Sequence, residues 1–129
     1  MYTLTVRGHF DAAHALRGYA GECRNLHGHT WDVEATVAGE DLDERGILYD
    51  FKDLKADLSQ VLAAYDHCYL NEVPPFDQLS PTAENLARVV FENLSVRVKE
   101  ATDGRVHLTE IAVWESPVAR VVYGVRGGR

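Results

Sequence analysis

The chain contains little cysteine, with only Cys23 and Cys68 among its 129 residues. Two cysteines make no regular disulfide framework, and no charged-then-apolar leader opens the chain, so we expect a protein of the reducing cytosol. The sequence also lacks an apolar run long enough to cross a bilayer. These absences predict a cytoplasmic protein with no membrane partner.

Basic residues are also scarce, because 13 Lys and Arg stand against 20 Asp and Glu and the net charge is −7. Affinity for nucleic-acid backbones depends on clustered Lys and Arg, so this balance argues against a nucleic-acid partner and favours a small-molecule substrate. The length fits a single domain, residues 1–129, that is large enough to bury a core without disulfides or a structural metal.

Two segments near the N-terminus alternate apolar and polar residues, as half-buried strands do. In residues 2–10 the apolar side chains occupy even positions, and in residues 29–37 they occupy odd positions. Continued along each strand, the first apolar face reaches His14 and the second reaches His29 and His27, because side chains on a strand alternate between faces. The sequence therefore predicts that two apolar faces, each ending in imidazole, meet around one ion.

The rest of the chain predicts two helices and two further strands. Asp50 is expected to cap a helix over residues 50–65, and Ser80 a second helix with Pro81 at its first position; residues 66–79 are expected to form a loop. Strands are expected over residues 106–115 and 119–125.

This order of elements predicts the α+β class, with a four-stranded antiparallel sheet and two helices inserted between strands 2 and 3 and packed on one face. The two open edges of such a sheet favour pairing between subunits, so we expect a homo-oligomer.

His14, His27 and His29 form a candidate metal site. Three neutral imidazoles on Zn²⁺ leave a fourth coordination position open, which is the catalytic pattern, although iron, nickel or cobalt suits the same nitrogen ligands. Cys23 has two interpretations: a fourth ligand that closes the site, or a separate base or nucleophile whose thiolate is favoured by nearby positive charge. Taken alone, a His-Gly-His triplet is also compatible with ordinary polar residues at a strand end.

Two further candidates carry carboxylates. In Asp66-His67, the carboxylate is suited to orient the ring for proton transfer, but such a dipeptide is also common at a helix C-terminus. Glu115 follows the apolar segment 111–114 and is suited to accept two parallel hydrogen bonds from an amidine-like edge of a pterin or guanine, or to be a solvated residue at a strand end.

Short motifs are spread over nearly the whole chain: Phe10-Asp11-Ala12-Ala13-His14, Cys23-x-x-x-His27-Gly28-His29, Asp50-Phe51, Asp66-His67-x-Tyr69-Leu70-Asn71, Pro81-Thr82-Ala83-Glu84-Asn85 and Trp114-Glu115. Together they resemble the 6-pyruvoyltetrahydropterin synthase family. The three-residue spacer after Cys23 looks like the 6-carboxytetrahydropterin synthase branch of queuosine biosynthesis.

The resemblance implies the tunnelling fold, in which sheets of several subunits form a barrel, commonly in a homohexamer with active sites at subunit interfaces. It implies zinc on His14, His27 and His29, and a proton-transfer group whose Cys23 reaches its partners across an interface. The implied roles of the other site residues are proton transfer for Asp66 and His67, and pterin binding for Glu115 with Thr82 nearby.

The implied reaction converts 7,8-dihydroneopterin triphosphate to 6-carboxy-5,6,7,8-tetrahydropterin, acetaldehyde and triphosphate. The alternatives are formation of the pyruvoyl product, aldolase cleavage of dihydroneopterin, or a non-catalytic, zinc-stabilised pterin-binding module. Intact Cys23, Asp66 and His67 argue against the module, because a binding protein needs no proton relay.

Overall fold

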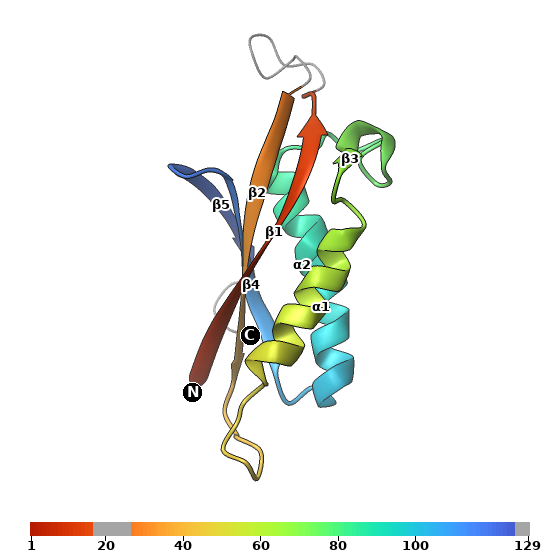
Figure 1. The fold of residues 1–129 in the computed structure, drawn as a ribbon. Helices are drawn as coiled ribbons and strands as arrows, with labels where there is room; N and C mark the ends of the chain where they lie inside the picture. The colour runs from red at the N-terminus through yellow and green to blue at the C-terminus, as the bar shows by residue number, and fades with distance from the viewer. Residues whose placement is uncertain (17–26, 126–129) are drawn as a thin grey trace.

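The computed structural model describes residues 1–16 and 27–125, and within these ranges two long helices pack on one face of a single sheet (Figure 1). In chain order the elements are β1 (Tyr2–His14), β2 (His27–Gly39), α1 (Phe51–Ala63), β3 (Cys68–Tyr69), the 3₁₀ turn η2 (Leu70–Glu72), α2 (Ala83–Thr102), β4 (His107–Ser116) and β5 (Ala119–Gly124).

The predicted alternation in the first two strands is confirmed. β1 and β2 pair antiparallel over their whole length, from Tyr2 opposite Gly39 to His14 opposite His27. In β1 the buried side chains are at even positions and end at His14, and in β2 they are at odd positions from Trp31 to Val37. β1 and β2 therefore place their helix-facing apolar sides together and end side by side.

The prediction of a four-stranded antiparallel sheet is wrong in its detail. The described residues form a five-stranded sheet in the order β3-β1-β2-β4-β5, and β3 pairs parallel with β1 opposite Ala12 and Ala13. A two-residue strand is too short to show any periodicity, and it lies in the segment predicted to be a loop. The predicted α+β class and the two helices on one face are confirmed.

Both helices begin where a side chain satisfies the first backbone N–H groups. The predicted cap of α1 is confirmed, because Asp50 accepts a hydrogen bond from the Lys52 N–H. The predicted Ser80 cap of α2 is wrong: the cap is Thr82, whose hydroxyl accepts from the Asn85 N–H at 3.1 Å. The Ser80 carbonyl instead accepts from the Asn85 side chain at 2.9 Å, and residues 80–82 precede the helix without regular secondary structure.

One hydrophobic cluster joins the helices to the sheet. Leu54 and Leu58 of α1, and Leu86 and Leu94 of α2, are fully buried in it against the inward residues of the strands. Neither helix in the described ranges combines the length and apolar character needed to cross a membrane. This core fixes the positions of the strand ends that carry the candidate site.

Candidate active site

His14 and His29 lie together at the end of the β1–β2 ladder. Their Nε2 atoms are 3.2 Å apart, and their rings meet edge to face with centroids 5.1 Å apart. The side chain of His14 is completely buried, whereas that of His29 is 23% exposed. One imidazole is therefore held inside the protein and the other faces the opening of the site.

Glu115 of β4 completes a cluster of three side chains. Its Oε1 atom lies 3.3 Å from His14 Nε2 and 3.6 Å from His29 Nε2. All three donor atoms lie within 4.8 Å of one another. Three strands thus bring two imidazole nitrogens and one carboxylate oxygen to a single point, which we call the imidazole cluster.

The donor set and spacing of the imidazole cluster fit a transition-metal ion. Nitrogen ligands at about 2.0–2.1 Å from a tetrahedral ion are about 3.3 Å from each other, close to the distance between the two Nε2 atoms. His14 Nδ1 lies 2.7 Å from the carbonyl oxygen of Pro81, and because a carbonyl only accepts, Nδ1 carries the proton. His14 Nε2 therefore keeps its lone pair for a metal, in the arrangement typical of metal-binding histidines.

The Trp31 ring packs against both imidazoles. It is fully buried, stacks parallel to Phe10 with centroids 6.0 Å apart, and meets the rings of His14 and His29 edge to face at 4.9 and 5.2 Å. Its Nε1–H donates to the carbonyl of Ala12 at 3.4 Å. This aromatic base restricts ring rotation and orients both Nε2 atoms.

Two predicted members of the site cannot be placed. The backbone of His27 begins β2 and pairs with His14, but its side chain lies outside the described part of the structure. Cys23 belongs to residues 17–26, which also lie outside the described residues. The structure therefore brings together two of the three predicted metal ligands and adds Glu115.

Asp66 and His67 form a second ionisable group beside β1. Asp66 Oδ1 lies 3.0 Å from His67 Nδ1 and accepts a hydrogen bond from the backbone N–H of Asp11 at 2.9 Å. The hydrogen bond from the Asp11 N–H lowers the pKa of Asp66 below its usual value, and the neighbouring His67 ring adds a smaller effect in the same direction. His67 has a left-handed backbone (φ 58°) and donates its N–H to the Asp11 carbonyl at 2.6 Å.

The Asp66–His67 pair is not part of the imidazole cluster. It contacts the backbone of Asp11. The Asp11 side chain is exposed and points to the opposite face of β1 from the buried His14. The His67 side chain is 78% exposed and the Asp66 side chain 40% exposed. The pair therefore lies at the outer edge of the sheet, with its two side chains oriented toward each other but open to solvent in a single chain.

Residues 3–125 match the family described as 6-pyruvoyl tetrahydropterin synthase. The chain belongs to this family. The resemblance drawn from the motifs is thereby confirmed, and the chain is an enzyme of the 6-pyruvoyl tetrahydropterin synthase family, with lyase-type chemistry.

Among relatives, the chain is 34% identical over 125 residues to the 6-carboxy-5,6,7,8-tetrahydropterin synthase of Bacillus subtilis, covering 93% of this chain and 83% of the relative. It is 36% identical over 112 residues to the dihydroneopterin monophosphate aldolase of Pyrococcus furiosus, covering 87% and 88%. The structure of Caenorhabditis elegans 6-pyruvoyl tetrahydropterin synthase matches with a TM-score of 0.84 at 28% identity, covering 96% of this chain and 95% of that one.

Within this family fold, Thr82 has a capping role that the sequence analysis assigned to Ser80. It caps α2 and directly follows Pro81, whose carbonyl accepts from His14. The first turn of α2 and the orientation of His14 are therefore linked through one peptide unit.

Asn71 is a further residue whose role the sequence did not show. Its side chain accepts from the Ala15 N–H at 2.9 Å and donates to the Ala15 carbonyl at 2.8 Å. These two bonds hold the backbone immediately after His14. The only sequence signal was its place in the segment that follows Asp66-His67.

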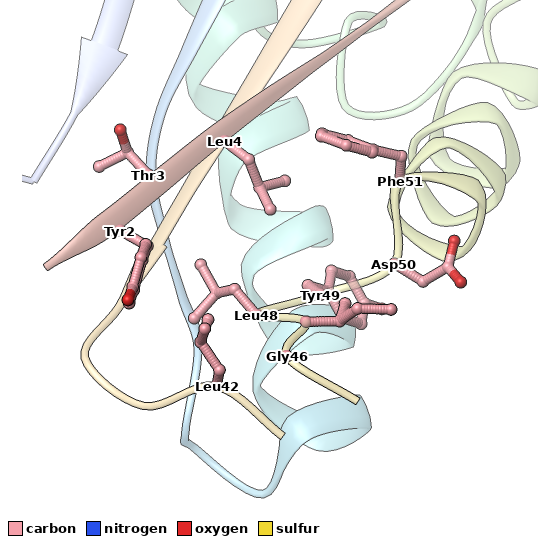
Figure 2. Close-up of a pocket in the computed structure, with 10 residues that line it drawn as sticks. Tyr2, Thr3, Leu4, Leu42, Gly46, Leu48, Tyr49, Asp50 and Phe51 are labelled. Carbon is pink, nitrogen blue, oxygen red and sulfur yellow. The ribbon is translucent and has the colours of Figure 1, made fainter. Parts of the chain in front are cut away.

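A pocket of about 440 Å³ lies at the other end of β1, lined by the strand start and the loop before α1 (Figure 2). Its walls include Leu4, Leu42 and Phe51. Two of its polar side chains are engaged, since the Asp50 carboxylate caps α1 and the Tyr49 hydroxyl donates to Asp57. This pocket contains no cluster of ionisable groups, so it is not the candidate active site.

Proposed function

We propose that this chain is a 6-carboxy-5,6,7,8-tetrahydropterin synthase, which converts 7,8-dihydroneopterin triphosphate to 6-carboxytetrahydropterin, acetaldehyde and triphosphate in queuosine biosynthesis. The observation that carries the proposal is the imidazole cluster in a chain whose similarity to synthases of that name extends over most of its length. The low cysteine content supports a cytoplasmic setting for this reaction.

His14, His27 and His29 are the proposed ligands of a zinc ion, with iron, nickel and cobalt as metals that suit the same donors. A metal ion held by these residues would supply Lewis-acid polarisation of the substrate side-chain oxygens, which would make the adjacent C–H bond more acidic. The protein's own contribution is orientation: Pro81 sets the tautomer of His14, and Trp31 restricts both described rings.

Asp66, His67 and Cys23 are the proposed proton-transfer group. Asp66 remains ionised and orients His67, which then accepts or donates a proton through its other ring nitrogen. Cys23, as a thiolate, is the proposed partner in this transfer.

The exposed position of the pair supports an active site shared between subunits, in which Asp66 and His67 of one chain face the imidazole cluster of another. We propose that this occurs in a homohexameric barrel built through the sheet edges.

Glu115 is the proposed anchor of the pterin ring. Its carboxylate is 35% exposed, so a ligand can reach it, and it can accept two parallel hydrogen bonds from ring N–H groups. Thr82 is proposed to act nearby through the first turn of α2.

Aldolase cleavage is a second candidate, favoured by the similarity to the Pyrococcus furiosus aldolase. Formation of the pyruvoyl product is a third, because the family and its solved structures carry that name.

An assay of the reaction products separates these candidates. The zinc-loaded protein is incubated with 7,8-dihydroneopterin triphosphate, and the products are identified by chromatography. Acetaldehyde with a carboxylated pterin is the expected result. A pyruvoyl product without acetaldehyde replaces the proposal with the pyruvoyl alternative. Release of a phosphorylated two-carbon aldehyde, when dihydroneopterin monophosphate is supplied as a second substrate, replaces it with the aldolase alternative. No turnover by metal-loaded protein indicates a binding module, and chelated protein is the control.

A further inference from the structure

Glu115 lies closer to the two histidines than a pterin anchor alone requires. Its Oε1 is 3.3 Å from His14 Nε2 and 3.6 Å from His29 Nε2, while the two nitrogens are 3.2 Å apart. Donor atoms that share one tetrahedral ion are separated by about 3.3 Å, given metal–ligand bonds of about 2.0–2.2 Å. The carboxylate oxygen therefore lies at the spacing expected of an additional ligand.

We propose that Glu115 is a ligand of the metal ion when no substrate is present and leaves the ion when the pterin ring binds. The inference rests on the proposed function. One carboxylate cannot do both tasks at once, because the amidine-like edge of a pterin lies at the opposite end of the ring system from the side chain whose oxygens the ion would bind. Departure of Glu115 opens a coordination position at the moment when the substrate side chain arrives.

The charge and exposure of the cluster favour this exchange. Neutral imidazoles leave the double charge of the ion uncompensated, and a carboxylate halves it. His14 is fully buried with its Nδ1 held by Pro81, so it cannot swing away, whereas the Glu115 side chain is 35% exposed. Among the described ligands, Glu115 is thus the one suited to move.

The test uses the full-length protein loaded with Co²⁺, whose visible absorption reports coordination number and ligand type. Glu115→Gln keeps the shape and removes the charge, and Glu110→Gln on the same strand is the matched control. We expect Glu115→Gln to change the cobalt spectrum and to weaken Co²⁺ binding at least about tenfold. Glu110→Gln should match the wild type in both measurements.

A second experiment adds unsubstituted pterin to the cobalt-loaded protein, because this ligand has the ring edge but lacks the side-chain hydroxyls. When it binds, as followed by pterin fluorescence, the wild-type cobalt spectrum should shift toward that of Glu115→Gln. An unchanged spectrum on pterin binding overturns the proposal, as does a thiolate-to-cobalt charge-transfer band that Cys23→Ala removes and Glu115→Gln leaves intact.

The failure of this inference is distinguishable from failure of the proposed function. A protein that releases acetaldehyde while Glu115→Gln binds cobalt like the wild type refutes only the exchange of ligands. A wild-type protein that binds no cobalt refutes the metal site itself, and with it the proposed function.

Discussion

The imidazole cluster and the Asp66–His67 pair are built in opposite ways. The cluster lies on the helix-facing side of the sheet, with His14 fully buried and held by Pro81 and Trp31 of the same chain. The pair lies at the outer sheet edge, where the backbone of Asp11 hydrogen-bonds to both residues, and both side chains are exposed. The side chains of the imidazole cluster are packed by residues of their own chain. Those of the Asp66–His67 pair are exposed to solvent, where a second chain can contact them.

Removal of the buried imidazole should have the largest effect. In His14→Ala we expect loss of stoichiometric metal and, since a metal ion contributes several kcal/mol to such reactions, a decrease in turnover of at least about 100-fold. The buried Pro81 carbonyl also loses its donor, which costs about 1–3 kcal/mol of folding free energy. Metal content after loading and desalting, with thermal unfolding, measures both effects.

His9→Ala is the matched control for that change. His9 lies on the same strand, but its side chain is exposed and has the opposite parity to His14. The His9→Ala variant should bind metal and unfold at the same temperature as the wild type. Stoichiometric metal in folded His14→Ala would show that the ion binds elsewhere.

Asp66→Asn should lower turnover without affecting metal binding, which would show that the Asp66–His67 pair and the imidazole cluster have different roles. The amide oxygen can still accept from the Asp11 N–H, so the fold and the metal content should not change. Loss of the carboxylate that orients His67 should lower turnover by about 10²–10⁴-fold. Steady-state kinetics with metal analysis tests this, and Asp77→Asn, in an exposed loop position, is the control. Reduced metal content in Asp66→Asn would contradict the separation.

Mixing the two inactive variants tests whether the groups of different chains form one site. If His14→Ala and Asp66→Asn chains are unfolded together and reassembled, an interfacial site should recover about a quarter of wild-type activity, because each site draws its two halves at random. Each variant reassembled alone is the control. Absence of recovery in assembled mixtures would place both groups of the site in one chain.

The same contrast explains what the sequence could predict. Apolar alternation predicted β1 and β2 and the meeting of their terminal histidines, because a one-residue slip in register would turn the buried face toward solvent. Asp50 was predictable as a cap because an acidic residue directly precedes an apolar helical pattern. These features depend on local patterns that repeat over many residues.

Features that depend on single contacts between distant segments were not predictable. β3 has only two residues, and the left-handed backbone of His67 depends on a hydrogen bond to Asp11, fifty-six positions earlier. The residues alone left Glu115 as either a pterin anchor or a solvated residue at a strand end, and family resemblance favoured the anchor. Its proximity to His14 depends on the order of strands in the sheet. No periodicity in the sequence encodes these pairs.

The smallest effect concerns Thr82, which joins the buried cluster to α2. Thr82→Ala removes the hydroxyl that accepts from the Asn85 N–H, and loss of such a cap costs about 1 kcal/mol. For a chain of this length, that lowers the unfolding midpoint by about 3–5 °C. Thermal unfolding of the metal-free protein measures this term without any contribution from the ion.

Thr82→Ser is the matched variant because it keeps the accepting oxygen, and it should restore the midpoint. If the cap also holds the Pro81 carbonyl against His14, Thr82→Ala should weaken Co²⁺ binding while Thr82→Ser does not. A lower midpoint with unchanged cobalt affinity would show that the cap stabilises the helix alone. The orientation of His14 would then depend on Trp31 and on the Asn71 bonds to Ala15.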